Sequence, residues 1–148
     1  MGDPTTVRLL LFRVGALLGA VAVEEVAEIL PRLDTTRIPG AMPFVAGLVN
    51  VRGTLVTVVT GWRALGQPEG GPDAGASVVL LRLQGGRRLI GLTVDDVVDL
   101  VTVAQDDLQD RAALPGVDPV LVRAVGRRGS GSYVVLDTAA LFAPVLAS

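Results

Sequence analysis

The chain has 148 residues, half of them apolar, and a mean hydropathy of +0.56. That length suits one domain with a sizeable hydrophobic core, and that composition argues against disorder. The formal net charge is −2, and all 13 basic residues are Arg. Such a chain offers no broad cationic face to nucleic acid, and its few aromatic residues offer no stacking platform for bases. We therefore expect no nucleic acid partner.

The sequence contains neither His nor Cys. This excludes disulfides, thiol catalysis, His-based triads and most transition-metal sites. We therefore expect no enzyme activity, no cofactor and no bound metal. No apolar run reaches the roughly 18 residues of a membrane span, and Arg13 interrupts the run near the N-terminus that imitates a secretory signal. The sequence thus indicates a soluble, cytoplasmic protein without direct membrane insertion.

In chain order, the pattern is that of short strands separated by turns. Apolar runs meet at glycines, which supply the positive φ of a tight hairpin turn. Strands are predicted at residues 7–14, 16–22, 45–51, 54–59, 77–84, 88–94, 121–127 and 132–136. Short helical segments are predicted at residues 23–27, 61–66, 94–97 and 137–147, and the Gly- and Pro-rich stretch 66–75 is the clearest loop.

The chain also repeats itself. Residues 9–30 align with 79–101, since each copy has two apolar runs around a Gly turn, followed by Val, two acids, Val and a third acid. Residues 51–65 align with 127–141, sharing Arg-Gly, Val-Val and Ala-Leu. One duplicated unit of about 70 residues explains both similarities. Because several runs are apolar on both faces, we expect a mainly β fold of two small barrels that share a core.

Three carboxylates, Glu24, Glu25 and Glu28, lie in the stretch "VEEVAEIL" (23–30). Paired carboxylates hydrolyse glycosides or bind Ca²⁺ and Mg²⁺ when their oxygens converge. On one helical turn, however, Glu24 points about 100° away from the other two. The second copy also replaces all three acids by the shorter Asp, which a tight catalytic geometry would tolerate badly. A carboxylate-dependent hydrolase is therefore the disfavoured alternative.

A short helical corner accounts for the same stretch better. In this interpretation Glu24 and Glu25 stay in water, and the apolar residues that pack inward are Val23, Val26 and Ile29. Glu28 differs, because it lies between apolar neighbours where the next strand begins, and a partly buried carboxylate needs a cationic partner. The predicted partner is Arg52, in the Arg-Gly turn of a hairpin. The single Trp62 and Tyr133 are predicted to pack in the core and not to line a ligand pocket.

The assembled pattern resembles the CheW family, the adaptors of bacterial chemosensory arrays. The residues that carry this resemblance are "FRVGALLGAVAVEEVAEIL" (12–30), "TRIPGAMPFVAGLVNVRGTLVTVV" (36–59), "LIGLTVDDVVDLV" (89–101) and "VVLDTAALF" (134–142). The resemblance implies one CheW-like domain over residues 1–148, with two intertwined, pseudo-symmetric five-stranded SH3-like β-barrels and short helices. Its subdomains would cover about 14–70 with parts of the termini, and about 76–140.

The resemblance also implies a function. Members of the family are non-enzymatic scaffolds that join the regulatory domain of a CheA-type histidine kinase to the cytoplasmic tip of chemoreceptors. A cytoplasmic member is recruited to membrane-associated or soluble receptor arrays. Glu28 and Arg52 match a charged pair that the family uses. The positions that match the family's receptor-side or groove residues are Val26, Glu28, Gly47, Arg52 and Leu100.

The chain departs from the family pattern in two places. After "N-x-R-G" the family usually has Pro-x-x-Asp-Leu, where this chain has Thr57, Thr60 and Gly61. The second hairpin, "GRRGSGS" (126–132), is unusually basic and rich in Gly. These departures leave open a second hypothesis, a specialised CheW-like interaction protein that binds only the kinase or only the receptor.

Overall fold

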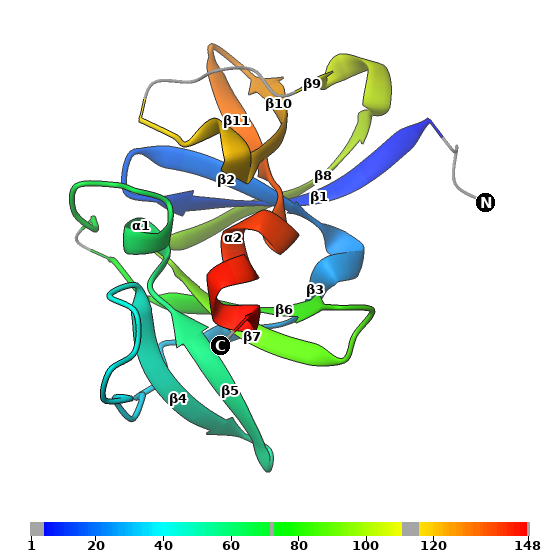
Figure 1. The fold of residues 1–148 in the computed structure, drawn as a ribbon. Helices are drawn as coiled ribbons and strands as arrows, with labels where there is room; N and C mark the ends of the chain where they lie inside the picture. Colours follow the sequence, from blue (N-terminus) through cyan, green and yellow to red (C-terminus); the bar gives the residue numbers. More distant parts are fainter. Residues whose placement is uncertain (1–4, 72, 111–115, 148) are drawn as a thin grey trace.

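The computed structural model describes residues 5–71, 73–110 and 116–147, and its strands form two sheets (Figure 1). Sheet A contains, in spatial order, β8 (Asp96–Ala104), β1 (Thr6–Val14), β2 (Leu17–Ala22), β11 (Gly131–Leu136), β10 (Val122–Arg128) and β9 (Gln109–Asp110). Sheet B contains β3 (Val26–Pro31), β6 (Ser77–Leu83), β7 (Arg88–Val94), β5 (Thr54–Val59) and β4 (Val45–Val51). The helical segments are α1 (Gly61–Ala64), α2 (Thr138–Leu146) and the 3-10 turns η1 (Val23–Glu25), η2 (Gln105–Asp107) and η3 (Pro119–Leu121).

The two halves of the chain exchange hairpins between the sheets. The β1–β2 hairpin pairs antiparallel with β8 and parallel with β11, with Gly19 opposite Val134. In the same way, the β6–β7 hairpin pairs antiparallel with β3 and parallel with β5, with Gly91 opposite Val58. The copies of the repeat therefore correspond strand for strand. The prediction of a mainly β, internally duplicated fold with short helices is confirmed, with β9 as an extra two-residue strand.

Each sheet contains strands from both copies of the repeat, so neither sheet corresponds to one half of the sequence. Sheet B runs from Val26 to Val94, so it takes β6 and β7 from the second copy of the repeat. Sheet A takes β1 and β2 from the first copy. The predicted subdomains, about 14–70 with parts of the termini and about 76–140, follow the repeat in the sequence and stay a prediction.

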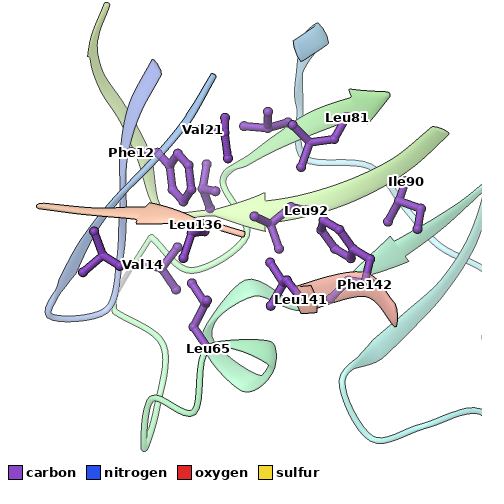
Figure 2. Close-up of a cluster of buried hydrophobic side chains, with 14 of the residues drawn as sticks. Phe12, Val14, Val21, Leu65, Leu81, Ile90, Leu92, Leu136, Leu141 and Phe142 are labelled. Carbon is purple, nitrogen blue, oxygen red and sulfur yellow. The ribbon is translucent and has the colours of Figure 1, made fainter. Parts of the chain in front are cut away.

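The buried residues form three layers, which is why several strands are apolar on both faces. The central cluster takes residues from both sheets, among them Phe12, Leu81 and Leu92 (Figure 2). The neighbouring residues on the same strands face the other way. Leu11 enters a second cluster that belongs to sheet A, and Leu80 enters a third that belongs to sheet B. Each sheet is thus covered twice, as the sequence predicts.

Helix α2, the last element of the described chain, packs against the central cluster. The helix begins after Asp137, whose Oδ1 accepts a hydrogen bond from the backbone N–H of Ala140 at 3.1 Å, an N-cap that satisfies a free donor. Leu141 and Phe142 point from α2 into the cluster (Figure 2). Burial of these two side chains and of Val145 fixes the helix against both sheets.

The helical segment predicted at 94–97 is wrong. β7 extends to Val94 and β8 begins at Asp96, with only a bend between them. The Asp95 backbone N–H donates to the carbonyl of Arg13 at 2.8 Å, and its Oδ2 accepts from the N–H of Gly15 at 3.0 Å. These two bonds tie Asp95 to the β1–β2 hairpin, so the chain passes directly into β8.

The first copy of the acid motif does contain a helical turn, but two of its side chains lie elsewhere than predicted. Ile29 is predicted to pack inward, yet it is 45% exposed. Among the described residues it lies on β3, an outer strand of sheet B whose one paired neighbour is β6. Glu25 is predicted to stay in water, yet it is half-buried next to Arg123 and Thr138.

Candidate functional site

Glu28 and Arg52 form an ion pair at the surface of sheet B. Glu28 lies on β3, and Arg52 lies in the turn between β4 and β5. Both terminal nitrogens of Arg52 bind the carboxylate, Nη1 donating to Oε2 at 3.3 Å and Nη2 donating to Oε1, a two-point geometry that fixes the guanidinium plane. The hydrogen bond and charge of Glu28 raise the pKa of Arg52. Because the Arg52 side chain remains 70% exposed, the pair presents an oriented guanidinium to solvent.

The hairpin turn determines where Arg52 points. Val51 pairs with Thr54, which leaves Arg52 and Gly53 as a two-residue turn with φ of 48° and 87°. Two consecutive positive φ values are typical of the type I′ turn, which matches the twist of the flanking strands. The Asn50 side chain stabilises this turn, since its Oδ1 accepts a hydrogen bond from the N–H of Gly53 at 2.7 Å.

Gly47 is buried, and a close backbone contact accounts for the glycine. It follows the bulge in β4, and a Cβ at this position would lie 2.4 Å from the carbonyl oxygen of Thr36. The neighbouring Leu48 exchanges two backbone hydrogen bonds of 2.8 Å with Thr36. Gly47 therefore allows the segment around Thr36 to pair with β4 beside the hairpin that carries Arg52.

Val26 and Leu100 lie on different sheets. Val26 is half-buried on β3 and packs against the central cluster. Leu100 lies on β8 opposite Leu10, a member of that cluster. Cross-strand partners project to the same side of a sheet, so Leu100 faces the side of the central cluster, yet it is 58% exposed. The structure thus brings Glu28 and Arg52 into contact, with Val26 on the same strand as Glu28, whereas Leu100 belongs to sheet A.

A second ion pair occupies the corresponding place in sheet A, and it is not among the predicted site residues. Arg128 Nη2 lies 3.1 Å from Asp99 Oδ2, with Asp99 on β8 and Arg128 at the end of β10. The repeat contains the signal for this pair. Asp99 follows Glu28 by 71 positions and Arg128 follows Arg52 by 76, the same two offsets that relate the copies of the repeat.

The three acids of the "VEEVAEIL" stretch do not converge. Glu24 is exposed, and Glu28 is bound to Arg52. One carboxylate oxygen of Glu25, Oε2, is buried without a hydrogen-bond partner, and burial raises the pKa of this carboxyl although Arg123 and Thr138 oppose the change. Across the described residues, no three His, Cys, Asp or Glu side chains are grouped so that they could hold a metal ion.

Trp62 and Tyr133 both pack, as predicted. Tyr133 is 3% exposed and belongs to the sheet A cluster. Trp62 is half-buried against the central cluster, with the guanidinium carbon of Arg63 4.9 Å from its ring centroid, a cation–π contact. In the part of the chain that the structure describes, no helix has the length and apolar character needed to cross a membrane.

Comparison with known proteins identifies the family. The model of the CheW-like domain matches residues 8–145, almost the whole chain. The chain belongs to the CheW family. A solved CheW-family structure, the scaffolding protein TtCheW from Thermoanaerobacter tengcongensis, superposes with a TM-score of 0.83 over 92% of both chains at 18% sequence identity. At that identity the match supports the CheW fold.

Curated CheW-family relatives are similar in sequence as well. The chemotaxis protein CheW of Rhizobium meliloti (strain 1021) is 32% identical over 101 residues, which span 68% of this chain and 64% of that protein. The chemotaxis protein CheW of Treponema pallidum (strain Nichols) is 24% identical over 140 residues, which span 91% of this chain and 81% of that protein. The matched part of this chain thus spans under two thirds of the first relative and about four fifths of the second.

Proposed function

We propose that this CheW-family protein is a cytoplasmic, non-enzymatic adaptor that couples chemoreceptors to a CheA-type histidine kinase. The observation that carries the proposal is Arg52, an exposed guanidinium held in one orientation by Glu28 and by a two-residue turn. Similar proteins support the proposal: TtCheW is described as a scaffolding protein, and the curated relatives are named chemotaxis proteins. The absence of His and Cys from the sequence agrees with a binding role.

The binding surface that we propose centres on the ion pair. A pre-oriented Arg loses little side-chain freedom on binding, and Arg is enriched among the residues that dominate interfaces. Ile29, beside Glu28, and Leu55, near the turn, are 45% and 69% exposed and add apolar area to the same hairpin and strand. The proposed contact residues for the receptor tip or the groove are Val26, Glu28, Gly47, Arg52 and Leu100, with Gly47 acting through the backbone that it positions.

The test is a binding assay with two fragments, the regulatory domain of the kinase and the signalling tip of the receptor. Wild-type protein is expected to bind both. Arg52→Ala is expected to weaken receptor binding by about tenfold or more, as for the loss of a hydrogen bond to a charged group. The fold should persist, because exposed ion pairs contribute only about 0–1 kcal/mol to stability.

Arg87→Ala is the matched control, since Arg87 is an exposed Arg on the β6–β7 hairpin. It should bind both fragments as wild type does. If the wild-type protein binds neither fragment, the proposal is refuted. If Arg52→Ala unfolds the protein, Arg52 has a structural role instead.

A second candidate function is an interaction protein that binds only one of the two partners. It is favoured by the segment that departs from the family pattern, Thr57, Thr60 and Gly61. Gly61 starts α1, its N–H donates to Thr93 Oγ1 at 2.9 Å, and a Cβ there would lie 2.1 Å from the carbonyl oxygen of Thr93. This segment is thus built around a close contact with β7. Binding to one fragment and not to the other would select this candidate.

A further inference from the structure

We propose that Arg82, on β6, is a positioning residue for the binding surface at Arg52. It acts through a β-bulge in β3, which decides the side of sheet B to which Glu28, the partner of Arg52, projects. The inference rests on the proposed function, because it takes Arg52 as a receptor contact. It adds a residue that is not among the proposed contact residues.

An irregularity in the pairing of β3 with β6 sets the orientation of Glu28. Val26 lies opposite Leu81. The next residue in register, Glu28, lies opposite Leu80, so Ala27 is an extra residue in β3. Such a bulge sets two residues of one strand against one residue of the other. It therefore interrupts the alternation of faces, and Glu28 projects to the side opposite Val26.

The buried clusters identify the two sides. Cross-strand partners project to the same side of a sheet. Leu81, the partner of Val26, belongs to the central cluster. Leu80, the partner of Glu28, belongs to the third cluster, against which Val51 at the end of β4 also packs. In a strand without the bulge, Glu28 would project toward the central cluster, away from the side that the β4–β5 hairpin contacts.

Arg82 holds the chain where it enters the bulge. Its Nη1 donates to the carbonyl of Val26 at 2.7 Å and to the carbonyl of Glu24 at 3.3 Å. Arg82 lies opposite Leu89 of the third cluster, so its side chain takes the same side of the sheet as Glu28. Because a bulge disrupts the backbone ladder locally, side-chain bonds to the neighbouring carbonyls stabilise it. The guanidinium of Arg82 therefore fixes the backbone from which Glu28 projects.

The second copy of the repeat contains the same bulge. Val97 of β8 lies opposite Phe12 of β1. Asp99 lies opposite the preceding residue, Leu11, so Val98 is the extra residue. Asp99, like its counterpart in the first copy, follows the bulge and forms an ion pair. In both copies, therefore, a bulge orients the paired acid.

The bonds that hold the two bulges differ. Arg13 corresponds to Arg82, since each follows the residue that lies opposite the Val before the bulge. Arg13 contributes its backbone carbonyl, which accepts a hydrogen bond from the N–H of Asp95 at 2.8 Å. Asp95 Oδ2 also accepts from the N–H of Gly15 at 3.0 Å. The second copy thus relies on Asp95, whereas the copy that presents Arg52 relies on the side chain of Arg82.

NMR of the Arg52 guanidinium tests the inference without any partner. Rotation about its Nε–Cζ bond breaks the two-point contact with Glu28, so it should be slow in wild type. Arg82→Ala should raise the rotation rate toward that of Glu28→Ala, which lacks the partner. Slow rotation in Arg82→Ala, or rotation in wild type as fast as in Glu28→Ala, would overturn the proposal.

Arg87→Ala is the matched control for Arg82→Ala. Arg87 is an exposed Arg of the same hairpin, and its Nε donates to the carbonyl of Gln84 at 3.0 Å. The control thus removes the same charge and also a side-chain bond to a backbone carbonyl. Rotation of the Arg52 guanidinium should stay slow in Arg87→Ala, and an acceleration equal to that in Arg82→Ala would overturn the proposal.

Binding to the receptor fragment gives the functional readout. Because Arg82 is exposed, Arg82→Ala should fold, and it should bind about threefold to tenfold more weakly, as expected when one long side chain must be ordered on binding. Arg82→Lys keeps a charged donor and should bind more tightly than Arg82→Ala. In the Arg52→Ala background, Arg82→Ala should cause no further loss. A general structural role predicts equal losses in both backgrounds, and that result would overturn the proposal.

Deletion of Ala27 tests whether Arg82 acts through the bulge. Without this residue, the ordinary alternation of a strand places Glu28 on the side opposite Val26, as the bulge does in wild type. Adding Arg82→Ala to the deletion should then leave the rotation of Arg52 slow. An acceleration as large as in the undeleted chain would overturn this route. If the deletion variant does not fold, the rotation rates of Arg82→Ala and Arg87→Ala decide.

The two readouts separate this inference from the proposed function. If wild type does not bind the receptor fragment but Arg82→Ala accelerates the rotation of Arg52, the proposed function is refuted and the positioning role is supported. If receptor binding depends on Arg52 but is unchanged in Arg82→Ala, the positioning role is refuted and the proposed function is supported.

Discussion

At the scale of single residues, Gly47 lies where two backbone segments come closest. Any side chain there would place a Cβ 2.4 Å from the Thr36 carbonyl oxygen, closer than atoms can approach. We predict that Gly47→Ala lowers the free energy of unfolding by about 1–3 kcal/mol, the usual cost of forcing extra atoms into a packed site. Urea denaturation measures this change. Gly131→Ala is the control, because its Cβ would have no contact closer than 3.8 Å, and an equal effect in both variants would contradict the steric cause.

Glu25 makes the stability of the protein depend on pH in a direction that follows from its burial. Burial raises the pKa of its carboxyl above the ordinary value of 4.5, so the folded state holds the proton more tightly than the unfolded state. The stability linked to this group is present below pH 4.5 and is lost as the pH rises through the folded pKa. Glu25→Gln keeps the shape of the neutral acid and avoids this loss.

We therefore predict that Glu25→Gln becomes more stable relative to wild type as the pH rises from 4.5 toward neutrality. Urea denaturation of both proteins across that range measures the difference. Glu24→Gln, at the exposed neighbour, should follow wild type. A difference between Glu25→Gln and wild type that stays constant with pH would show that the charge of Glu25 does not carry the effect.

The residue-scale predictions from sequence succeed where the partner lies within the same repeat unit. A carboxylate between apolar neighbours requires a cation, and the predicted partner is Arg52, in the Arg-Gly turn of a hairpin; the structure pairs the two. The burial of Glu25 depends instead on Arg123 and Thr138, from strand β10 and helix α2 far along the chain. Local sequence spacing contains no information about that packing.

At the scale of elements, the β4–β5 turn depends on one side chain. Asn50 accepts the hydrogen bond from Gly53 that closes the turn around Arg52. We predict that Asn50→Ala lowers the free energy of unfolding by about 0.5–1.5 kcal/mol, the net value of one hydrogen bond, and weakens binding to the receptor fragment because Arg52 loses its fixed orientation. Denaturation and the binding assay test the two effects. Asn50→Asp keeps the acceptor oxygen and should retain both properties; a loss as large as that of Asn50→Ala would contradict this role.

Hairpins can be predicted because a Gly turn and its two flanking apolar runs are neighbours in the sequence. The two acid motifs, in contrast, have similar sequences but fold differently. Residues 23–25 form a 3-10 turn, in which Arg82 donates to the carbonyls of Glu24 and Val26 at 3.3 and 2.7 Å. Residues 94–97 have the same pattern of Val and acids, yet Asp95 binds Arg13 and Gly15 of the first hairpin and no helical turn forms. In the second copy, the shorter side chain of Asp95 accepts a hydrogen bond from the backbone N–H of Gly15. Tertiary contacts therefore decide whether the motif forms a helical turn, which its sequence pattern alone does not determine.

At the scale of the whole molecule, the exchange of hairpins makes the two sheets interdependent. Sheet B cannot form without β6 and β7 of the second copy, and sheet A cannot form without β1 and β2 of the first. The central cluster adds side chains from both sheets and from α2. Unfolding of one sheet would therefore remove strands from the other copy and open the shared core. The repeat in the sequence predicts the duplication, but the exchange follows from pairings between distant strands.

The single Trp and the single Tyr report on different sheets, which allows this interdependence to be measured. Trp62 follows β5 of sheet B, and Tyr133 lies on β11 of sheet A. We predict that Trp fluorescence and Tyr absorbance give one coincident unfolding transition in urea, as for a two-state domain. Phe142→Ala, at a fully buried position of the central cluster, should shift both signals together and cost about 3–5 kcal/mol, whereas Leu55→Ala, which is 69% exposed, should shift neither. Two separate transitions, or a shift of one signal alone in Phe142→Ala, would mean that each sheet unfolds by itself.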